Sequence, residues 1–392
     1  MNPAARLARL LLATLLGVSA VSAVAAERPR AREAGIVIGP LPSGPANAIT
    51  DVAGVRVGQV TVIQGDGIRT GVTAIFAHEG NAFQVRVPAA IHVGNGFGKL
   101  LGVTQVGELG ELETPVLLTG TLGVWTAADA MVGWMLRQPG MEQVRSINPV
   151  VGETNDGFLN DIRARPLARA HVERALESAR SGAVEEGAVG AGTGTVAFGW
   201  KGGIGTSSRL VQGEGGAHTV GVLVQSNHGG RLTVAGVPMG NHLPDPASLA
   251  GVEGSRASAG NSGDGSIMIV VATDAPLDAR QLGRLGARAM SGLARTGSNL
   301  SHGSGDYVIS FSNAPQVRRN AGQPAPAPTL LAEQALTPLF EAVADATEEA
   351  ILNSLLRARD MRGHRGYVPA LPLAPVLERL RQAGVITAPD TD

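Results

Sequence analysis

The 392-residue sequence contains no cysteine, which excludes disulfides, thiol catalysis and thiolate metal sites. Aromatic residues make up only 3% of the chain, whereas hydrophobic residues make up 44% and glycine occurs 54 times. Such a composition predicts a core of Ala, Val, Leu and Ile with closely approaching backbones. The formal net charge of -1 provides no field for nucleic acid, and no tract combines Lys or Arg with interleaved aromatics. We therefore expect no nucleic-acid partner.

The N-terminus has the pattern of an export signal. Arg6 and Arg9 precede an apolar stretch from Leu10 to Val24, and small residues around Ala26 form an A-x-A-like processing site. We predict a signal peptide at residues 1–26, a periplasmic or secreted mature protein, and no stable membrane association after signal removal. The alternative is an uncleaved membrane anchor, although the stretch is near the lower length limit for spanning a bilayer.

Residues 27–392 are expected to form a single α/β domain, since layered folds of this length are common. Short apolar runs bounded by Gly, Asn and Asp predict strands at 35–39, 55–62, 71–76, 115–118, 219–225, 266–273 and 307–311. Apolar residues at helical spacing predict helices within 166–181, 278–295 and 338–361. The proline-rich stretch 323–328 is expected to be an extended surface connection, and 387–392 to be frayed.

The dipeptide Gly265-Ser266 joins a turn to a buried strand. A turn at 260–265 composed of Gly, Asn, Ser and Asp runs directly into Ser266, and the apolar run 267–272 follows. A hydroxyl at such a junction is fixed by the core yet reachable from outside, and the preceding glycine leaves its own carbonyl unobstructed. The pattern is compatible with a nucleophile that cuts its own backbone, but taken alone it is more typical of an ordinary turn before a strand.

Three other segments carry polar groups suited to chemistry. Ser304 and Asp306 lie two residues apart, so on an extended strand they share one face and can hold a hydroxyl and an amine by hydrogen bonds, although this segment alone is more typical of a polar turn. Glu153 opens a stretch with three carboxylates, which can bind calcium or an ammonium ion or simply solvate a loop. Asn227 ends an apolar strand, where its amide can donate to an oxyanion or shape a turn.

Other motifs fail on inspection. The run Gly94 to Lys99 imitates a phosphate loop, but Leu100 stands where a hydroxyl residue belongs. The eight histidines are dispersed, with no H-E-x-x-H and no pair at helix spacing, so a metal site has no support. A Ser-His-Asp triad could combine Ser266 and Asp306 with His302 or His228, yet no G-x-S-x-G elbow surrounds the serine.

These residues also carry a family resemblance. The chain resembles the DmpA-like β-peptidyl aminopeptidases, also called the L-aminopeptidase/D-esterase family, which are serine peptidases that mature by self-cleavage. The matching blocks run in order from about Gly35 to about Phe311 and comprise 47–52, 69–73, 94–99, 113–115, 149–154, 202–206, 265–266, 272–277 and 303–306. So many ordered blocks make a chance likeness improbable.

The resemblance implies an αββα-layered sandwich of the N-terminal-nucleophile-hydrolase type, without metal or organic cofactor. It also implies roles for single residues. Ser266 would be the nucleophile in self-cleavage and in hydrolysis, Asn227 would stabilise the oxyanion, and Glu153 would hold the substrate ammonium. Ser304 and Asp306 would polarise Ser266 and its amine. Some relatives have Glu where this chain has Asp306, which alters the geometry by one methylene, and relatives also vary at Asn155 and Phe158.

We therefore expect an exported, self-processing serine aminopeptidase that cuts itself into 27–265 and 266–392 and assembles as a homo-oligomer of αβ units. Its expected substrates are short peptides, amides or esters with N-terminal β-amino acid, D- or small L-residues, and the sequence does not choose among them. The base would be the Ser266 α-amine, whose reference pKa is about 7.7–8.0. The alternatives are an acyl transferase of the ornithine-acetyltransferase kind and an exported small-molecule binding protein that never cleaves.

Overall fold

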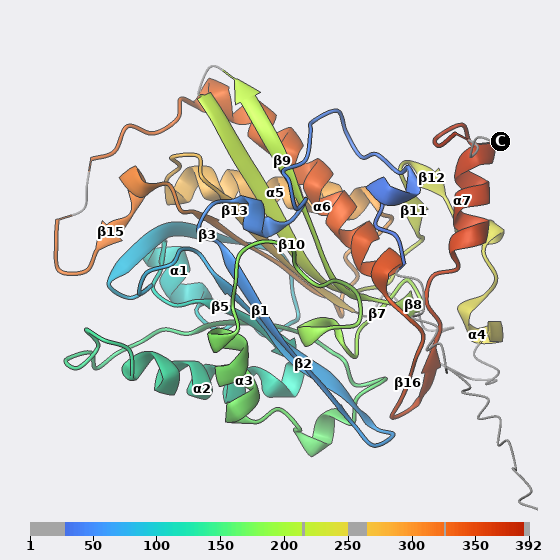
Figure 1. The fold of residues 1–392 in the computed structure, drawn as a ribbon, viewed down its shortest axis with the longest axis horizontal. Helices are drawn as coiled ribbons and strands as arrows, with labels where there is room; N and C mark the ends of the chain where they lie inside the picture. Colours follow the sequence, from blue (N-terminus) through green and yellow to red (C-terminus); the bar gives the residue numbers. More distant parts are fainter. Residues whose placement is uncertain (1–27, 214–215, 250–264, 325–326, 388–392) are drawn as a thin grey trace, which may run out of the picture.

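The computed structural model describes residues 28–213, 216–249, 265–324 and 327–387 (Figure 1). The predicted signal peptide, the turn predicted before Gly265 and the C-terminal end that was expected to fray thus lie outside the described residues, apart from residue 387. The helices are α1 (Val103–Leu109), α2 (Val124–Leu136), α3 (Arg169–Glu177), α4 (Pro246–Leu249), α5 (Ala279–Arg295), α6 (Thr337–Arg357) and α7 (Leu373–Gln382). Within the described residues, no helix combines the length and apolar character that crossing a membrane requires.

Two sheets contain the longer strands. The four-stranded sheet has the order β1-β2-β5-β6 and the seven-stranded sheet the order β15-β3-β14-β13-β10-β9, with β4 paired to β3. These strands are β1 (Arg56–Gln64), β2 (Ile68–Phe76), β3 (Val85–Gly96), β4 (Glu111–Leu112), β5 (Val116–Gly120), β6 (Val150–Thr154), β9 (Gly203–Gly213), β10 (Gly216–Asn227), β13 (Ser266–Thr273), β14 (Gly305–Ser312) and β15 (Arg319–Asn320). Three short hairpins are β7 (Val196–Ala197) with β8 (Trp200–Lys201), β11 (Thr233–Val234) with β12 (Val237–Pro238), and β16 (Met361–Gly363) with β17 (Gly366–Val368).

The sheets stack face to face between two helical layers. In Figure 1, α2 and α3 cover the outer face of the four-stranded sheet, while α5 and α6 cover the outer face of the seven-stranded sheet. Strand β13 shows why: Ile267, Ile269 and Val271 pack toward α5 and α6, whereas Met268 and Val270 belong to the cluster between the sheets. A strand buried on both faces reads as a continuous apolar run, because alternate side chains meet different layers.

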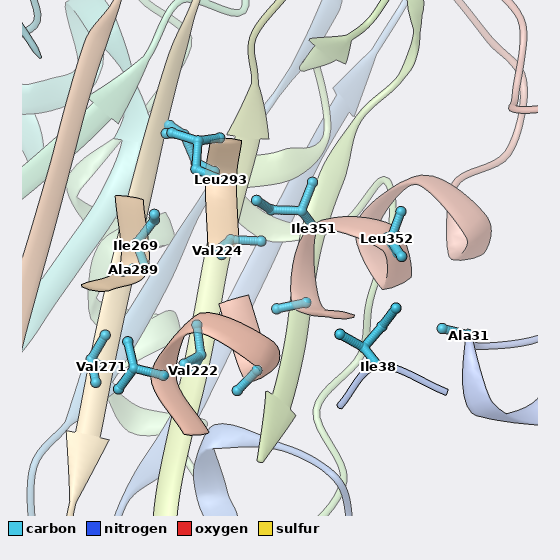
Figure 2. Packing of buried hydrophobic residues seen from close by; sticks show 14 of the residues in the cluster. Ala31, Ile38, Val222, Val224, Ile269, Val271, Ala289, Leu293, Ile351 and Leu352 are labelled. Carbon is cyan, nitrogen blue, oxygen red and sulfur yellow. The ribbon is translucent and has the colours of Figure 1, made fainter. Parts of the chain in front are cut away.

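The outer core is a continuous apolar cluster of strand and helix side chains. Each such side chain contributes about 1.5–3 kcal/mol when it is fully buried. Helix α5 begins at a capping box in which Asp278 accepts from the Gln281 N–H at 2.7 Å and Gln281 accepts from the Asp278 N–H at 3.3 Å. Figure 2 shows the packing with Val222 and Val224 of β10, Ile269 and Val271 of β13, Ala289 and Leu293 of α5, and Ile351 and Leu352 of α6.

Most elements expected from the sequence are confirmed, and one strand is wrong. The strands expected at 55–62, 71–76, 115–118, 219–225, 266–273 and 307–311 correspond to β1, β2, β5, β10, β13 and β14, and the three helices to α3, α5 and α6. Residues 35–39 form no strand. Ile36 and Ile38 are buried there, but the Ile38 carbonyl accepts from the Arg209 guanidinium at 2.8 Å instead of from a neighbouring strand. The short apolar run at 35–39 therefore indicated burial of its side chains and not pairing with a neighbouring strand.

Helix α6 crosses β9 at a glycine. A Cβ on Gly205 would lie 1.9 Å from the Ala350 carbonyl oxygen and 2.7 Å from the Ser354 nitrogen, both in α6. The backbone of α6 can approach β9 this closely only because residue 205 has no side chain. This contact is one instance of the close backbone approach that the glycine content predicts.

We expect Gly205→Ala to lower the free energy of unfolding by about 1–3 kcal/mol or more, because α6 must move away from β9. Gly213→Ala on the same strand is the matched control, since nothing lies within 4 Å of its added Cβ. Its effect should stay within about 0.5 kcal/mol. Urea unfolding followed by circular dichroism measures both. Equal midpoints for the two variants would show that the α6 contact is not tight.

Candidate active site

Ser266 lies where three strands of the seven-stranded sheet meet at one end. It is the first residue of β13, which pairs in parallel with β14 and antiparallel with β10. The register places Ser266 beside Asn227, the last residue of β10, and beside Gly305, the first residue of β14. Because parallel strands begin at the same edge and an antiparallel neighbour ends there, the fold brings these distant positions together.

The Gly305 N–H points at the Gly265-Ser266 junction. It donates to the Ser266 hydroxyl oxygen at 3.2 Å and to the Gly265 carbonyl oxygen, also at 3.2 Å. The Ser266 residue is only 6% exposed. A Cβ on Gly305 would lie 3.3 Å from the Ser266 hydroxyl and 2.5 Å from the Gly98 Cα, so this position admits no side chain. The junction is therefore tightly enclosed, with a backbone donor on both atoms that self-cleavage would involve.

Ser304 and Asp306 form the hydroxyl–carboxylate pair that their spacing predicts. The Ser304 hydroxyl donates to Asp306 Oδ1 at 2.6 Å. Asp306 is fully buried, and its Oδ2 has no hydrogen-bond partner among the described residues. Burial raises the pKa of Asp306 to about 6, although the Ser304 hydroxyl and the Ile267 N–H favour the ionised form. The free carboxylate oxygen can accept a further hydrogen bond from a group brought to this site.

Asn227 is held in one orientation by its neighbour on β7. The Val196 N–H donates to Asn227 Oδ1 at 2.9 Å, so the oxygen of the side-chain amide is occupied. No described residue accepts a hydrogen bond from the Asn227 Nδ2 group. Since Asn227 pairs with Ser266 across the ladder, an amide donor is available beside the hydroxyl.

Glu153 comes from the other sheet, near the end of β6. Its Oε1 accepts from the Lys99 N–H at 2.8 Å, and its Oε2 accepts from the Thr121 hydroxyl. Glu153 is 1% exposed, and burial raises its pKa above the ordinary value, while the Thr121 and Lys99 hydrogen bonds and the Lys99 charge act in the opposite direction. No basic side chain is paired with this carboxylate in the described part of the chain. A cation entering the site would therefore find an unneutralised acceptor.

The segment Gly94–Lys99 connects the two sheets at this point. A Cβ on Gly98 would lie 3.2 Å from Glu153 Oε1 and 3.0 Å from the Gly305 Cα, which places this glycine between the carboxylate and the Ser266 junction. The Asn95 amide donates to the carbonyls of Ser301, His302 and Ser304. The glycine run that resembles a phosphate loop in sequence thus packs against the site and is hydrogen-bonded to the segment that precedes β14.

Comparison with known proteins identifies the family. A sequence profile of peptidase family S58 matches residues 47–368. The chain is 40% identical over 391 residues to the β-peptidyl aminopeptidase BapA of Sphingosinicella microcystinivorans, covering 94% of this chain and 97% of that protein. The chain belongs to peptidase family S58.

Solved structures agree with this assignment. The L-aminopeptidase D-Ala-esterase/amidase from Ochrobactrum anthropi, described as a new variant among the Ntn-hydrolase fold, matches with a TM-score of 0.84 and 38% identity over 92% of this chain and all of that chain. A β-aminopeptidase from Burkholderia sp. matches with a TM-score of 0.81 and 40% identity over 91% of this chain and 99% of that chain. The αββα sandwich of the Ntn-hydrolase type is confirmed, and this S58 member is an aminopeptidase, a hydrolase acting on peptide bonds.

Among the described residues, neither His228 nor His302 hydrogen-bonds to Ser266 or Asp306, as a Ser-His-Asp arrangement would require. His228 follows Asn227 and is buried, but its Nδ1 contacts the Gly229 carbonyl at 3.3 Å and its Nε2 has no partner among the described residues. Burial lowers the pKa of His228 to about 4, so it is neutral at physiological pH. His302 packs edge-on against the Phe97 ring, with ring centroids 5.9 Å apart. The side-chain hydrogen bond that the Asp306 carboxylate accepts comes from the Ser304 hydroxyl and not from a histidine.

The carboxylate-rich stretch after Glu153 has a structural explanation that the sequence did not provide. Asp156 is buried, with Oδ2 accepting from the Thr70 hydroxyl at 2.5 Å and Oδ1 from the Asn160 amide at 3.1 Å. Burial raises the pKa of Asp156 to about 6, and the Glu153 charge adds to the shift. Across the described residues no group of three potential ligands is arranged to hold a metal ion.

Two further residues beside the candidate site were not found by sequence reasoning. Thr121 fixes Glu153, and Lys201 lies fully buried behind Asn227 on the β7–β8 hairpin. Thr121 has an ordinary sequence context, so no local signal could have found it. Lys201 does carry a signal, because it is one of only two lysines in the chain and follows a tryptophan in a segment of small residues.

We predict that Asp156 makes stability fall as pH rises. Folded Asp156 holds its proton up to about pH 6, whereas the unfolded carboxyl ionises near pH 3.9, so the folded state binds more protons between about 4 and 6. Wild-type stability should decrease across this window by more than that of Asp156→Asn. Urea midpoints at several pH values measure the difference. Asp66→Asn, which changes an exposed carboxylate, is the control, and its stability should depend on pH as that of wild type does. The same dependence of stability on pH in all three proteins would show that Asp156 does not cause the decrease.

Proposed function

We propose that this S58 aminopeptidase is exported, cuts itself between Gly265 and Ser266, and then removes N-terminal residues from short peptides, amides or esters. The observation that carries the proposal is the Gly305 N–H, which donates to both the Ser266 hydroxyl and the Gly265 carbonyl. Two relatives at 40% identity are named β-peptidyl aminopeptidases, so N-terminal β-amino acid residues are the first substrate class to test. No observation favours acyl transfer.

In the first reaction Ser266 Oγ attacks the Gly265 carbonyl carbon. The Gly305 N–H polarises that carbonyl. The Ser304–Asp306 pair of the neighbouring strand would polarise the hydroxyl, whose proton leaves as the new bond forms. The Gly265–Ser266 amide bond breaks, its nitrogen takes a proton, and an ester joins the Gly265 carbonyl to Ser266 Oγ. Water then hydrolyses the ester, which leaves a carboxylate on Gly265 and a free hydroxyl and α-amine on Ser266.

In the second reaction the neutral α-amine is the base. It takes the proton of its own hydroxyl, Ser266 Oγ attacks the substrate carbonyl, and the resulting ammonium protonates the leaving amine. The unpaired Oδ2 of Asp306 is suited to accept a hydrogen bond from this amine. Asn227 Nδ2 would donate to the oxyanion. Water hydrolyses the acyl-enzyme and regenerates the serine.

Glu153 would select the substrate by its free amine. A buried carboxylate that lacks a cationic partner binds an ammonium ion favourably, because the cation compensates the cost of burial. Gly98 places this carboxylate close to Gly305 and hence to Ser266. An N-terminal residue would then lie with its ammonium at Glu153 and its carbonyl at Ser266.

The remaining parts of the proposal concern location and assembly. Export rests on the sequence of residues 1–26, and the homo-oligomer of αβ units rests on the family resemblance. The cut would not separate the pieces, since strands β13 and β14 from residues after the cut lie between β3 and β10 from residues before it. Short peptides, amides and esters are the proposed partners, with no role for nucleic acid.

We predict that the purified protein contains two polypeptides, 27–265 and 266–392, because Ser266 cuts at Gly265. Ser266→Ala should give one uncut chain. The two wild-type pieces should copurify under native conditions and separate only in denaturant, because they share one sheet. Intact-mass analysis and a denaturing gel measure all of these outcomes. A single wild-type chain with full peptidase activity would exclude self-processing.

Glu153→Gln should impair hydrolysis while leaving self-cleavage largely intact, since only the substrate reaction uses the ammonium site. The rates to compare are those of a free-amine substrate and its N-acetylated form, for wild type and variant. Wild type should prefer the free amine strongly, and the variant should lose most of that preference. Equal turnover of the two substrates by wild type would show that Glu153 does not select the amine.

The base can be identified with four alanine variants. His228→Ala and His302→Ala should each keep substantial activity, because the proposed base is the Ser266 amine. Ser304→Ala and Asp306→Ala should lose about 100-fold or more, the scale for removing a group that takes part in proton transfer. The measurement is the rate of hydrolysis of a β-alanyl or D-alanyl anilide per cleaved molecule, with the cleaved fraction of each variant taken from a denaturing gel. A His302 variant that is cleaved and folded but inactive would instead support a Ser-His-Asp mechanism.

A further inference from the structure

A buried ammonium group lies behind the proposed oxyanion donor. Lys201, on β8, is fully buried, and its Nζ donates to the carbonyls of Gly192 at 2.9 Å, Thr195 at 2.9 Å and Gly202 at 3.0 Å. These three bonds use every N–H of the ammonium. No carboxylate is within ion-pair distance of Lys201 in the described part of the chain, and Asp156 is the charged group that acts on it from farther away.

The three carbonyls belong to the segment that contains the β7–β8 hairpin. Its turn has two left-handed residues, Phe198 with φ 54° and Gly199 with φ 82°, which is a strained conformation for an aromatic residue. The Phe198 N–H donates to the His228 carbonyl at 2.7 Å, and the two rings pack edge-on at 4.7 Å. The hairpin is therefore fastened to the end of β10, next to Asn227.

The same hairpin orients the Asn227 side chain. The Val196 N–H, one residue after the carbonyl of Thr195, donates to Asn227 Oδ1 at 2.9 Å. The Thr195 carbonyl also accepts from the Gly202 N–H at 3.1 Å, so Lys201 and the Gly202 amide hold the peptide that carries this donor. Movement of that peptide would release the amide of Asn227 from its single orientation.

We propose that Lys201 is a positioning residue whose ammonium fixes the Thr195–Val196 peptide and thereby keeps Asn227 Nδ2 directed at the reacting carbonyl. The inference rests on the proposed role of Asn227. Lys201 touches no reacting atom and acts through Val196 and Asn227. Lys201 would affect both self-cleavage and peptide hydrolysis, because in each reaction an oxyanion forms on the carbonyl group that Ser266 attacks.

The choice of lysine has a geometric reason. Nearly all basic residues of the chain are arginines, and the two lysines are Lys99 and Lys201. A compact ammonium can direct three N–H groups at carbonyls that converge on one point, whereas the planar guanidinium of arginine cannot. Burial lowers the pKa of Lys201 to about 7, with the Asp156 charge opposing the shift.

A double-mutant cycle tests the proposal. Lys201→Met keeps the length of the side chain and removes its charge, and Asn227→Ala removes the proposed donor. Lys201→Met should slow both self-cleavage and kcat by about tenfold or more while KM changes little, because oxyanion stabilisation is specific to the transition state. In the Asn227→Ala background, Lys201→Met should cost less than about twofold, since the donor it positions is already absent. Self-cleavage is followed by pulse-labelled cell-free synthesis, which records slow variants over days.

Leu352→Ala, a change of a buried core residue of α6, is the control for lost stability and should leave both rates near wild type. Equal costs of Lys201→Met in the two backgrounds, or a wild-type rate for Lys201→Met, would overturn the proposal. If Lys201→Met does not fold, Lys201→Gln and Lys201→Arg are measured in the same way. Failure of all three variants to fold would show that Lys201 is needed for folding and would overturn the positioning role. An Asn227→Ala variant with unchanged rates would instead disprove the oxyanion role in the proposed function.

Discussion

The register of three neighbouring strands is the constraint on which the rest of the structure depends. Ser266 faces Asn227 on one side and Gly305 on the other only because β13 pairs with both neighbours from its first residue. A slip of one residue would turn every side chain of β13 to the opposite face, so the side chains fitted to α5 and α6 would enter the layer between the sheets and those fitted to that layer would leave it. The hydrophobic burial of β13 between two layers therefore also determines where the hydroxyl lies.

Buried charge is concentrated around this junction. Glu153, Asp156 and Asp306 are buried carboxylates whose pKa values are raised by burial, and Lys201 is a buried ammonium whose pKa is lowered. Each is hydrogen-bonded to hydroxyl, amide or carbonyl groups rather than to an oppositely charged group. Burying a charge without such a partner costs free energy, and groups of this kind cluster at functional sites. Elsewhere the core neutralises its charges by pairing, as Arg209 does with Glu349 at 2.7 Å.

Much of the fold could be predicted from local pattern. Strand β13 begins and ends at the boundaries that its apolar run predicts, and the capping residue Asp278 marks the start of α5. The pattern failed at 35–39, where alternating isoleucines are buried without a strand partner. It also missed α2, whose residues 124–136 are apolar on nearly every face, so that helical periodicity is weak.

The sequence by itself determined the types of the site residues, namely a serine after glycine at a turn-to-strand junction and a hydroxyl and a carboxylate two residues apart. Their order along the chain also supported the resemblance to family S58. Only the tertiary structure decided which of them meet, because Glu153 and Ser266 lie on different sheets and are joined through Gly98. It likewise decided that Thr121 holds Glu153, since contacts between residues far apart in sequence depend on how the layers pack and leave no local pattern.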